Sequence, residues 1–294
     1  MCPRGTTSRS SCCGAERSVA VPRVPPIGGG DPWPRPRKRL GQHFLNDPRV
    51  LDDIVDALAP TMADTVVEIG PGRGSLTERL LARAGHVAAV ELDGALAERL
   101  RAAYASDPRV TVHARDVLDV SLAEIAGTDD FLVAGNVPYY ITTPILFHAL
   151  QPPRARRAVF LVQREVADRI IAPPGSTAYG ALSVNVQALA TAMLMRGVPA
   201  GAFTPAPRVD SAVIRIVPRS DPVVTDAEQP AFSAFVIAAF GMRRKQIRRV
   251  VRTLRGLAPV AAEQALSAAG VPPDARPEVL GPREFAALWR ALTP

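Results

Sequence analysis

The chain has 294 residues and a net charge of +7, and 47% of its residues are hydrophobic. This composition supports one large domain or two smaller ones and excludes a wholly disordered protein. No run of about eighteen apolar residues appears, and the N-terminal residues lack a continuous apolar segment, so we expect neither a membrane span nor a secretory signal.

The positive charge is concentrated in two segments. Residues 1–39 hold eight arginines and lysines against two acids, and residues 242–256 hold seven arginines and lysines and no acid. Because the whole chain carries +7, the remaining residues carry a net charge of −6. Basic blocks on an otherwise acidic chain favour a polyanionic partner, and a solvated basic face is the simpler alternative.

Cysteine and histidine show no pattern typical of a metal site. The three cysteines, Cys2, Cys12 and Cys13, all lie in the first thirteen residues, so the body of the chain has no disulfide framework. The histidines show no ligand spacing; they are His43, His86, His113 and His148. We therefore predict no metal and a reducing, cytoplasmic location.

The N-terminal region has the composition of a disordered segment. Residues 1–36 are rich in Pro, Gly, Ser and Arg and show no apolar periodicity, so we predict a disordered basic extension there. Its Arg and Ser content is weakly similar to a transit peptide, but the prolines and glycines of residues 22–36 oppose the amphipathic helix that such a peptide needs. A start site placed too far upstream is an equally good explanation.

From residue 37 onward, strand-like and helix-like segments alternate. A helix is predicted at Pro48–Leu58 with Asp47 as its N-cap, and another at Leu76–Ala84. Strands are predicted at Thr65–Ile69, His86–Leu92, Val110–His113, Phe131–Ala134, Ala158–Val162 and Val209–Val217. This alternation indicates an α/β, Rossmann-like domain over residues 37–218 with a doubly wound, mostly parallel sheet. Strand patterns cease after Pro218, which predicts a small all-helical domain over residues 219–294.

A glycine-rich turn follows the first of these strands. The residues from Glu68 to Thr77 read EIGPGRGSLT, and Gly70 and Gly72 allow the backbone to turn sharply and approach a ligand. The spacing differs from the G-x-G-x-x-G of dinucleotide sites, which makes a nicotinamide-dependent dehydrogenase a weak alternative. Glu68 is placed to face the cationic end of a ligand.

Two further acids end the next strands. Glu91 closes the second strand, where its carboxylate can accept both hydroxyls of a ribose. Asp116, followed by Val117, comes after the third strand and can accept from an adenine amine. Because the carboxyl ends of parallel strands meet at the ligand-binding edge of such a sheet, these residues predict one site for a nucleoside-containing cofactor.

The tetrapeptide Asn136-Val137-Pro138-Tyr139 follows the fourth strand. The exocyclic amine of adenine is a poor nucleophile because its lone pair is delocalised, so methyl transfer needs acceptors that hold both amine hydrogens. We expect the Asn136 side-chain oxygen and the Pro138 carbonyl to be these acceptors. We expect Tyr139 to stack on the base, a contact that contributes about 1–3 kcal/mol to binding. A simple Asx-Pro turn is the alternative, and the preceding acids favour an amine methyltransferase.

These motifs resemble those of the ribosomal RNA small-subunit adenine dimethyltransferase family from Lys38 onward. The motifs are KRLGQHFL (Lys38–Leu45), EIGPGRGSLT (Glu68–Thr77), Glu91-Leu92-Asp93, Asn136-Val137-Pro138-Tyr139 and FTPAPRVDS (Phe203–Ser211). The resemblance implies a class I methyltransferase that uses S-adenosyl-L-methionine to dimethylate two adjacent adenines in the 3′-terminal hairpin loop of 16S rRNA. It also implies that the substrate is the immature small ribosomal subunit and that the enzyme is a monomer.

The resemblance also implies roles for individual residues. It implies cofactor contacts from His43, Leu45, Gly70, Glu91, Asp116 and Asn136. It places Phe203 opposite Tyr139, so that the two rings sandwich an extruded base, whereas spacing alone would make Phe203 a core aromatic. The family more often has Asn where this chain has His43, and a backbone contact there would survive the change. Tyr140 is given no role beyond filling space.

The second basic segment is predicted to be an RNA-binding helix. Between Phe240 and Arg255, apolar residues mark one helical face and arginines mark another, which suits a phosphate track. The predicted RNA-binding residues are Lys38, Arg39, Arg244, Arg248, Arg249 and Arg252.

Two alternatives keep the same fold. Resistance methyltransferases that modify adenine in large-subunit (23S) rRNA have a similar tetrapeptide, so Asn136–Tyr139 does not discriminate between the two targets. The Gln42–Leu45 and Phe203–Ser211 motifs favour the small subunit. A non-enzymatic RNA-binding factor, as among mitochondrial transcription-factor relatives, is disfavoured by the intact tetrapeptide and the intact acidic residues.

Overall fold

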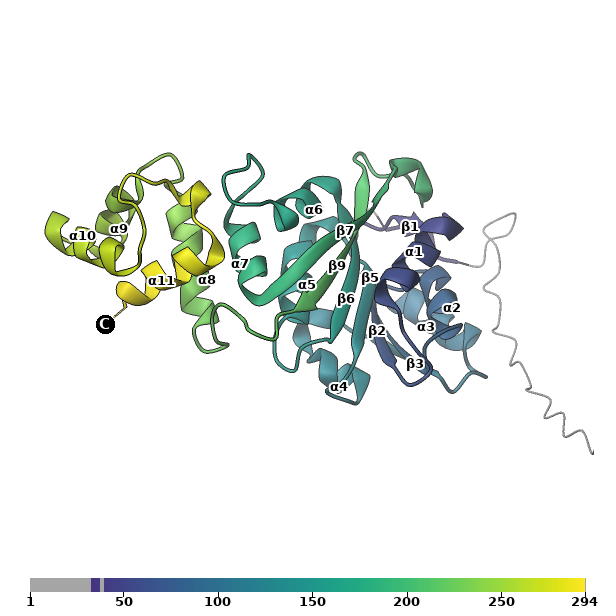
Figure 1. Ribbon diagram of the computed structural model, residues 1–294. Coiled ribbons are helices and arrows are strands. Elements are labelled where there is room, and N and C mark those ends of the chain that lie inside the picture. The colour runs from purple at the N-terminus through teal and green to yellow at the C-terminus, as the bar shows by residue number, and fades with distance from the viewer. Residues whose placement is uncertain (1–32, 38–39, 294) are drawn as a thin grey trace, which may run out of the picture.

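The computed structural model describes residues 33–37 and 40–293. Its centre is a seven-stranded sheet with the strand order β4-β3-β2-β5-β6-β9-β7 (Figure 1). The strands of this sheet are β2 (Thr65–Ile69), β3 (His86–Glu91), β4 (Val110–Ala114), β5 (Leu132–Asn136), β6 (Arg157–Gln163), β7 (Ala190–Val198) and β9 (Ser211–Pro218). Strands β2 to β6 pair in parallel, and β9 runs antiparallel between β6 and β7. The predicted α/β class with a mostly parallel sheet is confirmed.

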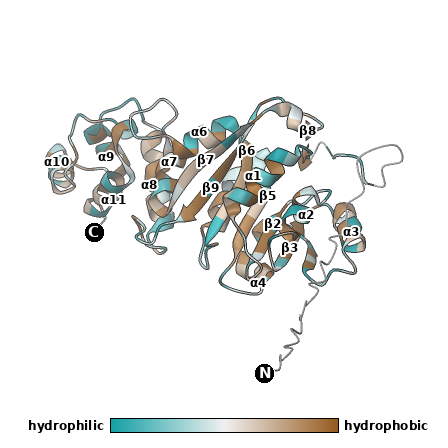
Figure 2. Ribbon diagram, turned by 45° about the vertical axis from the view of Figure 1, so that its right-hand side comes forward, coloured by the Kyte–Doolittle hydropathy of each residue, from teal (hydrophilic) through white to brown (hydrophobic). Residues whose placement is uncertain are grey.

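Helices cover both faces of the sheet. They are α1 (Pro48–Leu58), α2 (Ser75–Leu81), α3 (Gly94–Ala103), α4 (Leu122–Ala126), α5 (Thr142–Ala149), α6 (Arg164–Ile171) and α7 (Ala181–Leu189). Helices α1 to α3 share one apolar cluster with one face of the sheet, and α4 to α7 share the other. The inner strands β2, β3, β5 and β6 are apolar along most of their length because both of their faces are buried, whereas the edge strands β4 and β7 are partly exposed (Figure 2).

Beyond β9 the described chain is helical. The helices are α8 (Gln229–Phe240), α9 (Ile247–Arg255), α10 (Pro259–Ala268) and α11 (Pro282–Ala291). Figure 1 shows them at the end of the molecule away from α2 and α3. Their apolar residues continue the cluster on the α4–α7 face, so one uninterrupted core joins the sheet to this helical region. The boundaries at residues 36 and 218 stay predictions.

Most element predictions match, and several features differ. Helix α1 has the predicted bounds, and the Asp47 carboxylate accepts from the Arg49 N–H at 2.9 Å. Strand β7 was not predicted, because its Ala, Leu and Met residues favour helices and only its pairing with β9 makes it a strand. The short sheet of β1 (Phe44–Leu45) and β8 (Phe203–Thr204) was missed as well.

The helix predicted over Phe240–Arg255 is a turn followed by a shorter helix. Helix α8 ends at Phe240, Gly241 follows in a turn, and α9 begins only at Ile247. Arg244 therefore lies in the turn and not on the face that carries Arg248 and Arg252. The N-terminal prediction also needs a local correction, because Trp33 falls within the predicted extension and yet is buried in the core beside α1 to α3.

In the part of the chain that the structure describes, no helix is long and apolar enough to cross a membrane. Likewise, no group of three or more His, Cys, Asp or Glu side chains in these residues could hold a metal ion.

Candidate active site

A cavity opens at the edge of the sheet where the parallel strands have their carboxyl ends. The order of the strands along the chain reverses here, because β3 lies on one side of β2 and β5 lies on the other. The register sets Ile69 on β2 opposite Val90 on β3 and Gly135 on β5, which brings the ends of the three strands together. The cavity encloses about 1060 Å³, counting its open mouth, and residues of the N-terminal segment from Leu40 to Leu45 form one of its walls. Open α/β sheets bind their ligands at such a reversal.

Glu68 lies at the bottom of this cavity. Its side chain is 1% exposed, and one carboxylate oxygen accepts a hydrogen bond from the Thr77 hydroxyl of α2 at 2.6 Å. Burial raises the pKa of Glu68 to about 8, with a smaller contribution from the nearby Glu91 and an opposing one from Thr77. A cationic ligand beside this carboxyl group would stabilise its ionised form and lower its pKa.

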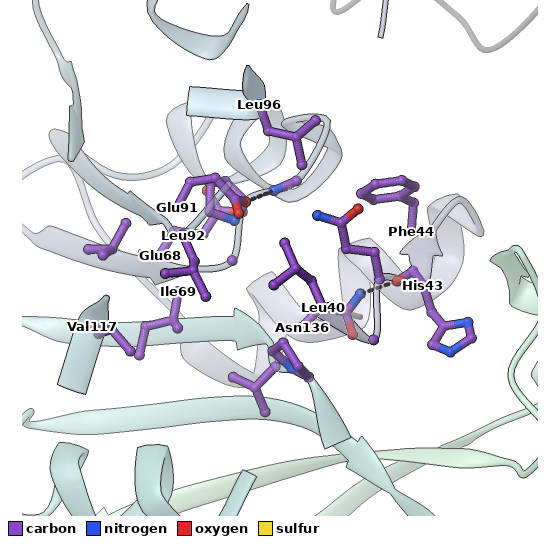
Figure 3. Close-up of a pocket in the computed structure, with 18 of the residues that line it drawn as sticks. Leu40, His43, Phe44, Glu68, Ile69, Glu91, Leu92, Leu96, Val117 and Asn136 are labelled. Carbon is purple, nitrogen blue, oxygen red and sulfur yellow. Dashed lines mark hydrogen bonds between the residues drawn. The ribbon is translucent and has the colours of Figure 1, made fainter. Parts of the chain in front are cut away.

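Glu91 is held by the glycine loop. Its carboxylate accepts from the Gly72 N–H at 3.0 Å and from the Asp93 N–H at 2.9 Å, and Figure 3 shows it beside Leu92 on the cavity wall. Burial raises the pKa of Glu91, and these two N–H groups oppose the shift. The carboxylate is thus fixed in place and keeps lone pairs that can accept further hydrogen bonds.

Gly72 fits only as glycine, for two reasons. Its φ is +58°, and an added Cβ would lie 2.9 Å from the Phe44 ring. We expect Gly72→Ala to lower the free energy of unfolding by more than the about 1–2 kcal/mol of left-handed strain alone, and to weaken cofactor binding. Urea unfolding and calorimetric titration measure the two effects.

Gly127→Ala is the matched control for this substitution. Gly127 has a φ of +68° and nothing within 4 Å of an added Cβ, so it carries the strain without the clash. Equal losses of stability in the two variants, with cofactor affinity unchanged in both, would contradict the role of close contact at Gly72.

The other predicted cofactor residues line the same cavity. Asp116 lies beyond β4, with one carboxylate oxygen accepting from the Leu118 N–H at 3.0 Å, and Val117 is buried beside it. Gly70 and Leu45 also line the cavity. The structure thus brings together the predicted acids, glycines and apolar residues.

Asn136 ends β5 and faces the N-terminal segment. Its side-chain N–H donates to the His43 carbonyl at 2.8 Å (Figure 3). This hydrogen bond fixes the orientation of the Asn136 amide, so its side-chain oxygen faces away from the His43 carbonyl. The imidazole of His43 points away from Glu91, and its Nδ1 lies 2.8 Å from the Pro205 carbonyl. His43 therefore contacts the site through its backbone, and its ring belongs to the cavity mouth.

Tyr139 lines the cavity, whereas Phe203 does not. The Tyr139 ring stacks on His43 with centroids 5.8 Å apart and planes 20° apart, and its hydroxyl lies 2.7 Å from the Ser211 hydroxyl. Burial raises the pKa of Tyr139. Phe203 is 4% exposed in the core with Leu45 and is not among the cavity residues. His43 is thus the ring that stacks on Tyr139 in this structure. The predicted sandwich of a base between Tyr139 and Phe203 stays a prediction.

The Pro138 carbonyl is not available as predicted. It accepts from the Ile141 N–H at 3.2 Å and from the Thr142 hydroxyl at 3.3 Å, where the chain enters α5. Its two acceptor positions are thus used to start the helix. The preceding Val137 also lines the cavity, and no described residue donates a hydrogen bond to its carbonyl.

Sequence reasoning missed several cavity residues. Phe44 and Leu92 are apolar walls, and Arg73 lies in the glycine loop with its guanidinium carbon 4.7 Å from the centre of the Phe44 ring. Leu92 is 48% exposed although apolar, as expected of a side chain that covers a flat ligand. Arg73 looked like an ordinary loop residue, and only the fold shows that it is buried.

The predicted RNA-binding cations fall into three groups. Lys38 and Arg39 lie outside the described residues. Arg248, Arg249 and Arg252 are exposed on α9, and no ion pair joins them to another described residue. Arg244 is exposed in the turn before α9.

Fold and site together define a class I methyltransferase. Its defining parts are the strand order, the antiparallel strand β9 within the seven-stranded sheet, the glycine loop after β2 and the acids at the ends of β3 and β4. The chain belongs to the ribosomal RNA adenine dimethylase family, whose sequence profile matches residues 34–288.

Full-length relatives and solved structures agree with this membership. "Ribosomal RNA small subunit methyltransferase A" of Thiobacillus denitrificans is 40% identical over 258 residues, covering 87% of this chain and 98% of that protein. The protein of that name from Bordetella avium is 43% identical over 257 residues, covering 87% and 95%. A dimethyladenosine transferase from Plasmodium falciparum superposes with a TM-score of 0.72 at 24% identity, covering 84% and 96%. The 23S rRNA methyltransferase ErmE gives 0.67 at 27% identity, covering 85% and 99%.

Proposed function

We propose that the protein uses S-adenosyl-L-methionine to dimethylate the exocyclic amines of two adjacent adenines in the 3′-terminal hairpin loop of 16S rRNA. The single observation that carries the proposal is the oriented Asn136 amide at the end of β5, beside a cavity with three acids. Relatives at 40–43% identity bear a small-subunit name, whereas ErmE, with a 23S name, is 27% identical. The cytoplasm, where ribosomal subunits are assembled, is the proposed location.

The residues present fit this cofactor. All three acids line the cavity. Glu91 would accept from the ribose hydroxyls, Asp116 from the adenine amine, and Glu68 would face the cationic amino-acid end. Val117 and Leu92 offer apolar surface to the adenine ring. When bound, S-adenosylmethionine supplies an electrophilic methyl group on a sulfonium.

The protein's part in the chemistry is to hold the adenine amine. The Asn136 oxygen accepts one amine hydrogen, and we assign the second to the Val137 carbonyl in place of the Pro138 carbonyl. Holding both hydrogens draws the nitrogen lone pair out of conjugation with the ring and toward the methyl group. Tyr139 provides a stacking face for the base. The methylated amine is acidic and loses its proton without a strong base.

Labelled methyl donor and purified ribosomal particles that lack the modification test this function. Incubation with this protein is expected to label adenines of the small subunit and to leave the large subunit unlabelled. Label found only in the large subunit would show that the resistance-type activity is the correct one. RNA binding without methylation of either particle would favour the non-enzymatic alternative.

The exposed arginines of α9 are expected to bind RNA phosphates. The double variant Arg248→Gln, Arg252→Gln should weaken small-subunit binding and reduce the salt dependence of log K by about one unit for each lost phosphate contact. The control is Arg83→Gln, Arg99→Gln. These two exposed residues lie just after α2 and on α3, and Figure 1 shows α2 and α3 at the opposite end of the molecule from α9. Equal effects from both pairs would mean that only net charge matters.

A further inference from the structure

Asp93 is a buried carboxylate at the edge of the site. Its side chain is 1% exposed at the beginning of α3, where one carboxylate oxygen accepts from the Ala95 N–H at 3.1 Å and caps the helix. Its backbone N–H donates to Glu91, the acid assigned to the ribose hydroxyls. A buried carboxylate is costly unless donors surround it, so its further partners indicate what the position serves.

The N-terminal part of the chain supplies these further partners. The Gln42 side-chain N–H donates to the second carboxylate oxygen of Asp93 at 3.3 Å, and the guanidinium of Arg37 lies 3.2 Å from the first. The oxygen of the same Gln42 amide accepts from the Arg37 backbone N–H at 2.8 Å. Helix capping alone requires none of these contacts. The Gln42 amide is held at both ends, and it joins the N-terminal wall of the cavity to the loop that carries Glu91.

The residue after Gln42 connects this wall to the reacting centre. The His43 carbonyl accepts from the Asn136 side chain at 2.8 Å and so orients the amide assigned to the adenine amine. Figure 3 shows both ends of the connection, with one dashed bond at Glu91 and another between Asn136 and the His43 carbonyl. A chain of contacts thus runs from the cofactor end of the cavity to the substrate end through Glu91, Asp93, Gln42, His43 and Asn136.

We propose that Gln42 is a positioning residue for methyl transfer, which acts by fixing the His43 carbonyl and hence the Asn136 amide. This role rests on the proposed function, because it presupposes that Asn136 holds the adenine amine. His43 is the next residue in the chain, so a shift of Gln42 displaces the His43 carbonyl with it. Misplacing a reacting group by about 1 Å can cost about 10²-fold in rate, so a contact at this distance from the amine still affects the reaction.

Exchanging the donor and the acceptor between Gln42 and Asp93 tests the proposal. Gln42→Glu sets a second carboxylate against the buried Asp93 and removes the hydrogen bond between them. In the double variant Gln42→Glu, Asp93→Asn, the new amide can donate to the new carboxylate while its oxygen still caps α3. Gln42→Ala removes the contact without adding a charge. Gln151→Glu, at an exposed position between α5 and β6, is the control for an added charge.

The rate is measured by single-turnover methylation of small-subunit particles at saturating cofactor. Urea unfolding and calorimetry measure the stability and the cofactor affinity of each protein. We expect Gln42→Glu to lower the rate about tenfold or more, and Gln42→Ala to lower it less. The double variant should recover the rate to within about threefold of the unaltered protein, because the hydrogen bond is restored. Gln151→Glu should leave the rate unchanged.

Each other result has a definite meaning. If the saturated rate is unchanged in both Gln42→Glu and Gln42→Ala, Gln42 does not position the reacting groups and the proposal is wrong. If the double variant regains stability but not rate, the contact only supports the fold, and the proposal is wrong as well. If the unaltered protein methylates neither ribosomal particle, the proposed function itself fails and this role fails with it. An active unaltered protein without rescue contradicts the role of Gln42 alone.

Discussion

Replacing Asn136 with alanine is expected to reduce the methylation rate by about 10²–10³, the usual cost of removing one oriented hydrogen-bonding group from a reacting centre. The Asn136 side-chain oxygen is the acceptor that the His43 carbonyl orients. Without it, the amine keeps its lone pair in the ring and reacts slowly. Single-turnover kinetics with saturating small-subunit particles measure this rate.

Binding should survive in the same variant. Asn136→Ala keeps the backbone of β5, and the lost bond to the His43 carbonyl costs about 1 kcal/mol of stability. RNA affinity is therefore expected to change less than about threefold. Asn136→Asp is the matched variant, because it keeps an acceptor oxygen and loses the donor. We expect its rate to lie between those of the unaltered protein and Asn136→Ala, and an unchanged rate in Asn136→Ala would refute the assigned role.

The sheet and its ligand-binding edge were predictable because local patterns agree with the fold there. The β-branched run Thr65–Ile69 favours a buried strand, and a glycine turn at the end of such a strand lies where parallel strands meet. Glu68, Glu91 and Asp116 follow successive strands, so their convergence in one cavity follows from topology. Strand β7 lacked such a pattern, since its identity depends on pairing with β9.

The base-binding side of the site was not predictable at the same level. The stacking of His43 on Tyr139 joins residues far apart in the sequence, and only the tertiary structure brings them together. The Pro138 carbonyl looked like a free acceptor because the sequence does not show that Ile141 and Thr142 donate to it. Orientation of side chains and use of carbonyls depend on tertiary contacts.

Glu68→Gln is expected to remove a large pH dependence of stability. The folded protein raises the pKa of Glu68 from 4.5 to about 8, mainly through burial. Folding therefore favours the protonated form of Glu68. The contribution of this group to the stability of the folded protein is complete at low pH and is lost as the pH rises toward 8. Between about pH 6 and pH 9, the stability of Glu68→Gln relative to the unaltered protein should grow by about 2–3 kcal/mol.

Ionisation of Glu68 should act on the cofactor in the opposite direction. The ionised carboxylate attracts the cationic groups of the ligand, so the affinity of the unaltered protein should rise with pH through about 8, whereas that of Glu68→Gln should not. Thr77→Val is the matched control, because it removes the 2.6 Å hydrogen bond that favours the ionised form and leaves Glu68 in place. In Thr77→Val, the pKa of Glu68 should be raised further. The pH-dependent changes in stability and in cofactor affinity should therefore both move to higher pH. Chemical unfolding and calorimetry across this range measure them, and coincident pH profiles for all three proteins would show that Glu68 does not titrate there.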